Sequence, residues 1–341
     1  MSGLSIFRKL LLGALCVVAG SAVASETIEL KMHSQIVESR PEAKYLQQFA
    51  DDVAARSNGR LKINVFHAGS LGLKDADLLR IMQAGAVDMA MLYGEYFTRD
   101  APELGVVYVQ GAIRTPQQHL QLLPTMRAIY EEGYAKWRIH TVGGVVSPVF
   151  NVGVHCKEPV NSLAQLKGKK LRVWGSHLVG TFQGLDVAAQ VIPQNSMYMA
   201  LQTGVVDCAY YLSTVAKTVS LQEVAKYEAY MHPWAAVPWM FGVSDKAWSR
   251  LPKDLQAVLV EAGEAMWAKT RDAAVSAERE NAAVEERKAL GITMLQPFSQ
   301  GDVSTFVAAS DKAWAEMAKS AGPKGIDYYQ RMKEAIAKLT P

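Results

Sequence analysis

Residues 163–211 read LAQLKGKKLRVWGSHLVGTFQGLDVAAQVIPQNSMYMALQTGVVDCAYY, and this stretch decides the fold class. Leu171–Trp174 is a short apolar strand between two glycine turns, and a helical segment follows it. A second short strand stops at Pro193, and a second helix leads into a third strand. This alternation predicts an α/β fold with a parallel sheet. Arg172 then lies close to the strand ends where such folds bind ligands.

The same alternation occurs nearer the N-terminus. Thr27–His33 and Leu61–Phe66 are predicted strands on either side of a predicted helix, Pro41–Arg56, and another helix and strand follow. Two α/β halves predict two lobes with a ligand cleft between them, an arrangement that can close by hinging. The Ala- and Glu-rich segment Leu255–Leu290 predicts one long helix. We expect one lobe over residues 25–148 and 237–276, and the other over 149–236 and 277–341.

The first 24 residues have the pattern of an export signal. Arg8 and Lys9 precede the short apolar run Leu10–Val18, and Ala22–Ala24 fits the small-residue cleavage pattern. No other apolar run is long enough to span a bilayer. We therefore expect a soluble exported protein whose signal peptide is cleaved near Ala24.

Composition sets further limits. The chain has 341 residues, of which 50% are hydrophobic and 20% charged, which is typical of a globular protein long enough for two domains. The signal segment carries two of the three net positive charges, which leaves +1, and the remaining basic residues are scattered, so nucleic acid is not an expected partner. An oxidising compartment would permit a bridge between Cys156 and Cys208, but we favour two separate buried thiols.

Enzyme motifs are missing from the sequence. The seven histidines are scattered and form no HExxH or other metal-binding spacing. There is no GxSxG nucleophile elbow, no GxGxxG and no phosphate loop. Acidic residues are plentiful, but no pair is marked out as catalytic. We expect no enzyme activity, no metal site and no cofactor.

Three stretches carry a resemblance to a known family. They are Gly59–Met91 (GRLKINVFHAGSLGLKDADLLRIMQAGAVDMAM), Leu163–Val173 (LAQLKGKKLRV) and Tyr198–Cys208 (YMALQTGVVDC). Together with the export signal they resemble the DctP-type solute-binding proteins of tripartite ATP-independent periplasmic (TRAP) transporters, from about Thr27 to the C-terminus.

The resemblance implies a periplasmic-binding-protein-like fold with a long helix spanning both lobes. It also implies capture of an organic anion, usually a carboxylate, and delivery to a membrane permease pair of the DctQ/DctM type by a protein that we expect to be a monomer. Some keto-acid-binding relatives use a bound cation, which nothing in this sequence requires.

Site residues follow from the resemblance position by position. The family's carboxylate-clamping arginine matches Arg172, and its pocket asparagine falls at Tyr211. The second arginine of sialic-acid-type members is Asn151 here, and the glycine of the VDG motif is Cys208. Trp174 replaces a proline that is common in the family. These departures argue against a sugar-acid ligand.

Arg172 is the principal candidate because a guanidinium can give two parallel hydrogen bonds to a carboxylate. One such charge-assisted bond contributes about 1.5–3 kcal/mol. Micromolar binding needs about 8 kcal/mol, so other groups must contribute as well. The alternative for Arg172 is a surface arginine at the start of a strand.

Other candidates are aromatic or polar residues near predicted strand ends. Aromatic rings supply flat apolar walls with one polar handle, although packing in the core is an equal alternative for each. Lys74 is also compatible with a solvated helix start, and Asn151 and Gln194 with turn or edge roles. The aromatic candidates are Tyr93, Tyr96, Trp174, Tyr210, Tyr211, Trp234 and Trp239, of which Tyr93, Tyr211 and Trp239 align nearest the family's pocket; the polar ones are Gln35, Lys74, Asn151 and Gln194.

The favoured hypothesis is a periplasmic TRAP solute-binding protein for a small monocarboxylate. The many aromatic candidates beside one arginine suggest an acid with an apolar or aromatic body, and a 2-keto or 2-hydroxy acid would fit as well. Two alternatives stay open: a secreted α/β enzyme acting on small carboxylates, and a chemosensory receptor of the same fold.

Overall fold

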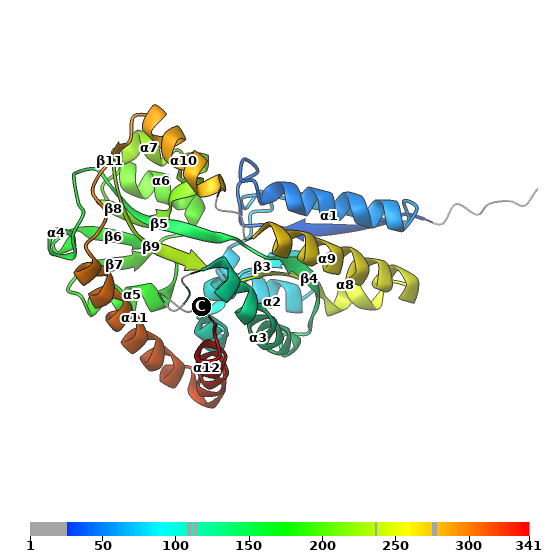
Figure 1. Cartoon of the computed structure of the whole chain (residues 1–341). Helices are drawn as coiled ribbons and strands as arrows, with labels where there is room; N and C mark the ends of the chain where they lie inside the picture. The colour runs from blue at the N-terminus through cyan, green and yellow to red at the C-terminus, as the bar shows by residue number, and fades with distance from the viewer. Residues whose placement is uncertain are drawn as a thin grey trace, which may run out of the picture.

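Two sheets, one in each lobe, form the framework of the molecule (Figure 1). The structure, a computed structural model, describes residues 26–107, 111, 113, 115–235, 237–274 and 278–340. The first sheet has the order β2-β1-β3-β10-β4, in which β1, β2 and β3 are parallel and β10 is antiparallel to β3 and β4. Its strands are β1 (Ile28–His33), β2 (Leu61–Phe66), β3 (Met89–Leu92), β4 (Ile139–Val145) and β10 (Trp239–Ser244).

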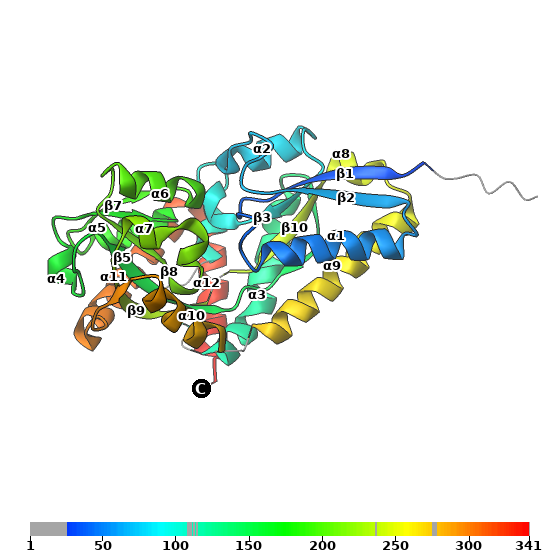
Figure 2. The ribbon, with the colours of Figure 1, turned by 90° about the horizontal axis from the view of Figure 1, so that it is seen from above.

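Apolar faces explain how the helices of the first lobe pack. In α1 the buried residues Leu46, Phe49 and Val53 recur at helical spacing and face the sheet, where Phe49 contacts Phe241. Helices α1 and α9 lie side by side along this lobe (Figure 2). Its helical elements are α1 (Ala43–Arg56), η1 (Asp75–Asp77), α2 (Leu78–Gln83), η2 (Gly94–Phe97), η3 (Pro102–Val107), α3 (Pro116–Ala135), α8 (Asp245–Ser249) and α9 (Lys253–Ala273).

The second sheet has the order β11-β9-β5-β8-β6-β7. β6 pairs in parallel with both β7 and β8, whereas β5 pairs antiparallel with β8 and β9. Its strands are β5 (Val149–Cys156), β6 (Lys170–Val173), β7 (Ala188–Val191), β8 (Cys208–Leu212), β9 (Tyr227–Ala235) and β11 (Thr293–Met294). Helical elements that accompany it are α4 (Leu163–Leu166), α5 (Ser176–Gln183), α6 (Gln194–Gln202), η4 (Ser213–Val219), α7 (Leu221–Val224), α10 (Glu278–Ala289) and α11 (Gln300–Ser320).

Two connections cross between the sheets side by side. β4 continues into β5, and β9 continues into β10, so that Val145 pairs with Trp239 in the first sheet and Val149 pairs with Ala235 in the second. Adjacent crossings of this kind are where two lobes can rotate against each other. The chain therefore changes sheet at residues 145–149 and again at 235–239.

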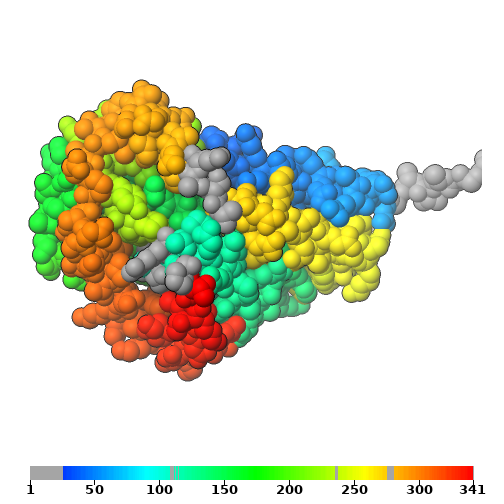
Figure 3. All heavy atoms as spheres, in the orientation of Figure 1, coloured from blue at the N-terminus to red at the C-terminus, as the bar shows by residue number. Residues whose placement is uncertain are grey.

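Two expectations about the later helices differ from the structure. The single helix predicted over Leu255–Leu290 is described as two helices: α9 ends before a turn at Ala274, and α10 packs against η4 of the second lobe. The intervening residues lie outside the described part of the chain. The last helix, α12 (Gly322–Ala337), packs against α3 and η3 of the first lobe as well as against α11, although we assigned it to the second (Figure 3).

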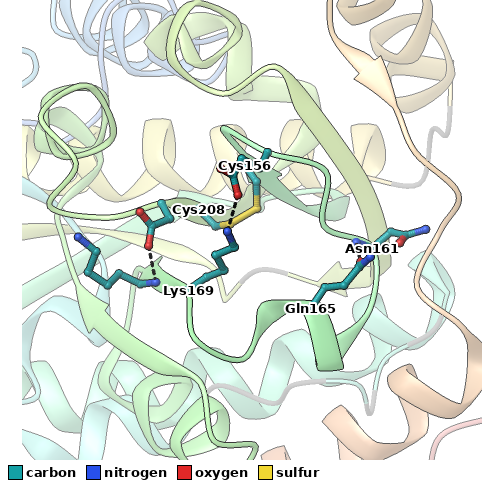
Figure 4. Close-up of a disulfide and its surroundings, with 8 residues drawn as sticks. Cys156, Asn161, Gln165, Lys169 and Cys208 are labelled. Atoms are coloured by element: carbon teal, nitrogen blue, oxygen red, sulfur yellow. Dashed lines mark hydrogen bonds and ion pairs between the residues drawn. A yellow bond between two sulfur atoms is a disulfide. The ribbon is translucent and has the colours of Figure 1, made fainter.

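The prediction of two separate thiols was wrong. Cys156 and Cys208 form a disulfide between neighbouring strands (Figure 4). The two residues are direct partners across the antiparallel β5–β8 pair, with Cα atoms 4.2 Å apart. Directly opposed residues in such a pair lie within disulfide reach. The strand register brings the two cysteines together, and spacing along the sequence does not reveal that register.

Candidate functional site

A cavity of about 40 Å³ lies where strand ends from both sheets meet. Gln35 and Ile36 follow the end of β1, and Tyr93 follows β3. From the second sheet, Trp174 follows β6 and Tyr211 lies near the end of β8. Parallel α/β sheets bind ligands at this end of their strands. The full lining is Gln35, Ile36, Arg40, Tyr93, Tyr96, Arg172, Trp174, Gln194, Tyr211, Leu212, Trp234 and Trp239.

Arg172 reaches this cavity from β6 and is fully buried. Its Nε donates to the Ile192 carbonyl at 2.8 Å, and its guanidinium lies 5.3 Å from the centre of the Tyr211 ring. No carboxylate pairs with it in the described part of the chain. Burial lowers the pKa of Arg172, although an arginine stays protonated in proteins. The cavity therefore holds a positive charge without a protein counter-ion.

A second arginine enters the same cavity from the other lobe. Arg40 lies in the loop between β1 and α1 and is 3% exposed. Its Nε donates to Glu42 Oε2 at 2.8 Å, and its Nη1 donates to Gln194 Oε1 at 3.1 Å. The charge of Glu42 raises the pKa of Arg40, against the opposing effect of burial. Arg40 is thus neutralised inside its own lobe, unlike Arg172.

Aromatic rings form the rest of the cavity wall. Trp174 lies 5.1 Å from Trp234 between ring centres, and Tyr93 meets Tyr96 edge to face at 4.9 Å. The indole Nε1 atoms of Trp174 and Trp239 and the amide Nε2 of Gln194 are buried without a hydrogen-bond partner among the described residues. Buried donors left without partners are costly, so a ligand rich in acceptor oxygens would stabilise this wall.

A buried acid lies beside the cavity at the lobe junction. Glu95 in η2 is 3% exposed, and its Oε2 lies 3.9 Å from Nδ1 of His177 in α5. Burial raises the pKa of Glu95 to about 8, which a hydrogen bond with Tyr93 partly opposes. Burial also lowers the pKa of His177 to about 3. At neutral pH this pair is a protonated carboxyl and a neutral imidazole, and it adds no net charge near the cavity.

The structure brings together nine of the twelve candidate residues, and Asn151, Lys74 and Tyr210 lie outside the cavity lining. Asn151 lies on β5 opposite Pro233 and does not line the cavity. Lys74 is an exposed residue before η1, in a neighbouring groove between the lobes. Tyr210 is a core residue whose hydroxyl forms a hydrogen bond with Nε2 of His232. The nine that line the cavity are Gln35, Tyr93, Tyr96, Arg172, Trp174, Gln194, Tyr211, Trp234 and Trp239.

Arg40, Ile36 and Leu212 line the cavity and were not among the predicted site residues. Leu212 follows Tyr211 on β8, so it could have been found as its neighbour. Arg40 had no comparable signal, because it lies several residues beyond the end of β1. A turn after β1, in which Arg40 N–H donates to the Val37 carbonyl at 3.1 Å, brings the Arg40 side chain back to the cavity. The sequence does not reveal this turn.

The described residues contain no group of three or more metal-ligating side chains placed to hold an ion. They also contain no helix that is both long and apolar enough to cross a membrane.

Comparisons with known proteins agree on one family. The family model of DctP, bacterial extracellular solute-binding protein family 7, matches residues 33–321. A solute-binding protein of Albidiferax ferrireducens is 27% identical over 87% of this chain and 83% of its own length. A monocarboxylate 2-oxoacid-binding periplasmic protein of Nostoc sp. is 30% identical over 61% of this chain and 58% of its own length.

Solved structures share the fold. DctP7 of Bordetella pertussis, an extracytoplasmic solute receptor binding pyroglutamic acid, superimposes with a TM-score of 0.79 at 20% identity, over 92% of this chain and all of the other. A TRAP periplasmic solute-binding protein of Rhodoferax ferrireducens with bound malonate superimposes with a TM-score of 0.79 at 22% identity. The match covers 91% of this chain and 98% of the other. Such proteins have two lobes, as this chain does.

The family implies a small-molecule ligand and membrane components of a TRAP transporter, and its members are periplasmic substrate-binding proteins for transport. With a family model that spans most of its length, this chain belongs to the DctP family of TRAP solute-binding proteins.

Proposed function

We propose that this protein captures a small organic monocarboxylate in the periplasm and presents it to a TRAP permease of the DctQ/DctM type. The supporting observation is Arg172, a fully buried guanidinium without a carboxylate partner among the described residues, in a cavity between two lobes. A buried charge of this kind is costly unless a counter-ion joins it. A ligand carboxylate supplies that counter-ion and accepts two parallel hydrogen bonds.

The cavity size and walls favour a small acid. Its volume is about 40 Å³, and one water requires about 10–15 Å³ by this measure. Aromatic rings can cover an apolar or aromatic body, and the donors without partners suit an additional oxo or hydroxy oxygen. The relative from Nostoc sp. is named for monocarboxylate 2-oxoacids, and the structural neighbours hold pyroglutamic acid and malonate. The fold therefore admits more than one class of acid, and the cavity residues must select among them.

In this proposal the ligand binds without chemical change. Arg172 holds the carboxylate while six other residues enclose the acid: Gln35, Tyr93, Trp174, Gln194, Tyr211 and Trp239. Ligand contacts from both lobes stabilise the closed arrangement, which the permease recognises. The protein acts as a monomer, after removal of a signal peptide near Ala24.

The test is a thermal-shift screen of organic acids on the mature protein. A ligand that binds only the native state raises the melting temperature by mass action. We expect shifts with small monocarboxylates that Arg172→Ala abolishes, and mass spectrometry should recover the bound acid unchanged. The exposed Arg271→Ala is the matched control. Shifts confined to neutral sugars or metal ions, or shifts that survive in Arg172→Ala, would reject the proposal.

A further inference from the structure

Arg40 and Glu42 form a buried ion pair at the edge of the cavity. Their side chains are 3% and 1% exposed, and Arg40 Nε lies 2.8 Å from Glu42 Oε2. Backbone hydrogen bonds hold this turn, because Ala43 N–H donates to the Arg40 carbonyl and Tyr45 N–H to that of Glu42. The pair is therefore fixed at the start of α1 before any ligand enters.

The guanidinium of Arg40 also connects the two lobes. Its Nη1 donates to Oε1 of Gln194, the first residue of α6 in the second lobe, at 3.1 Å. The Trp239 ring supports it from the first lobe, at 5.2 Å from the ring centre. Closure thus brings a second guanidinium, on the side opposite Arg172, against whatever the cavity holds.

The charges of the lining residues limit the charge of the ligand. Arg172 and Arg40 are the two charged residues among the described lining side chains, and Glu42 neutralises Arg40. The walls therefore carry a net charge of one, although they present two guanidinium groups. A monoanion balances this charge. A dianion would leave one buried carboxylate without a counter-charge, at a large cost.

We infer that the Arg40–Glu42 pair determines ligand selectivity: Arg40 donates to a second, uncharged oxygen of the bound acid, and Glu42 cancels its charge so that the site accepts monoanions. This inference rests on the proposed function, since it needs a carboxylate held by Arg172. The acid class that fits is a monocarboxylate with an acceptor oxygen next to the carboxylate. Simple alkanoates lack that acceptor, and dicarboxylates carry one charge too many.

Three acids of equal carbon number test the inference: propanoate, pyruvate and malonate. Their dissociation constants are measured by calorimetry at pH 7.5, where both malonate carboxylates are ionised. For the wild-type protein we expect pyruvate to bind at least tenfold more tightly than propanoate, the effect of one hydrogen bond to a charged donor, and malonate to bind more weakly than pyruvate.

Two variants separate the roles of the pair. Glu42→Gln leaves the charge of Arg40 uncompensated, so the affinity ratio of malonate to pyruvate should rise at least tenfold. The double variant Arg40→Gln/Glu42→Gln removes both charges together, which avoids a lone buried carboxylate. It should lower pyruvate affinity at least tenfold more than propanoate affinity. Glu38→Gln, an exposed acid in the same loop, is the matched control and should change neither ratio.

The outcomes distinguish this inference from the proposed function. If the wild type binds none of the three acids, the inference fails, and the wider acid screen decides the proposed function. If binding persists in Arg172→Ala, both fail. If wild-type binding depends on Arg172 but neither variant changes either ratio, only the inference fails. Circular dichroism and thermal melts of the double variant show whether it is folded. Should it be unfolded, the malonate-to-pyruvate ratio of Glu42→Gln alone decides the question.

Discussion

Arg172 and Arg40 face one cavity from opposite lobes, and their surroundings differ. Arg172 extends from β6, is held by a backbone carbonyl, and has no carboxylate partner among the described residues. Arg40 comes from a loop and is paired with Glu42. The first-lobe side chains that line the cavity thus carry no net charge, and Glu95, an acid close to them, keeps its proton at neutral pH. The second lobe supplies the charge that attracts an acid, and the first supplies a polar but uncharged cover.

The two lobes also differ in how they are braced. In the second, the disulfide joins β5 to β8, the strand that carries Tyr211. In the first, α9 packs on β4 through two glycines: a Cβ added to Gly263 would lie 1.5 Å from the Val142 carbonyl oxygen, and one added to Gly143 would lie 2.3 Å from the Gly263 backbone. Close backbone packing thus stabilises the first lobe, and a covalent bond stabilises the second.

The largest expected effect concerns Glu95, the buried acid beside the first-lobe side of the cavity. Glu95 has an ordinary pKa of 4.5 when exposed and about 8 when buried, so the folded protein binds a proton that the unfolded chain releases between these values. The free energy of unfolding therefore falls as pH rises from about 5 to 8. Glu95→Gln removes this loss and should be more stable than wild type at pH 8, by on the order of 4 kcal/mol.

Chemical denaturation at pH 5 and pH 8 measures that difference. At pH 5 the variant and the wild type should have nearly equal free energies of unfolding, and the difference between them should increase with pH. Glu261→Gln, which removes an exposed acid, should show no such trend. A pH-independent difference for Glu95→Gln would mean that Glu95 is ionised in the folded protein.

Removal of the disulfide tests how much the bridge stabilises the second lobe, which carries Arg172. Cys156 and Cys208 are 52 residues apart, and the closed loop contains β6, β7 and their helices. A double Cys→Ala variant should lose about 2–4 kcal/mol of unfolding free energy, because the bridge restricts the unfolded chain. The wild-type protein, compared in reduced and oxidised form, is the control without a mutation. A loss well under 1 kcal/mol would show that the bridge contributes little.

Arg172→Lys tests whether the charged wall needs the shape of guanidinium or only its charge. Lysine keeps the positive charge but cannot give two parallel bonds to one carboxylate. We expect affinity for a monocarboxylate found in the acid screen to fall about tenfold, or 1.4 kcal/mol. Calorimetry measures this, with the exposed Arg271→Lys as the matched substitution. Unchanged affinity would mean that the guanidinium is no bidentate clamp.

The smallest expected effect is at Asn151. The family alignment placed it at a second ligand-binding position, but on β5 it lies outside the cavity. Asn151→Ala should therefore change ligand affinity less than about twofold, which is within the range of substitutions that remove no contact. Lys74→Ala should behave alike. A tenfold loss in either would show that the cavity wall extends further than the lining described above.

Local pattern predicted most of the elements. β2 begins and ends at the predicted residues, and α1 and β6 lie within two residues of the predicted bounds. The family alignment and the predicted strand ends together named Arg172 and eight other residues that line one cavity. Each of these signals lies within a short stretch of chain, in a periodicity, a turn or an aligned motif. Expectations that depended on distant segments were less accurate, as the break between α9 and α10 in the predicted long helix shows.

Sequence alone therefore determined the α/β class, and it predicted an export signal and the arginine proposed to bind the carboxylate, because each depends on neighbouring residues. Tertiary structure decided the partners: Arg40 against Gln194, Cys156 bonded to Cys208, and Glu95 beside His177. Those pairs unite residues far apart in the chain. Strand register and lobe placement alone set their distances, and burial then sets whether each group carries a charge.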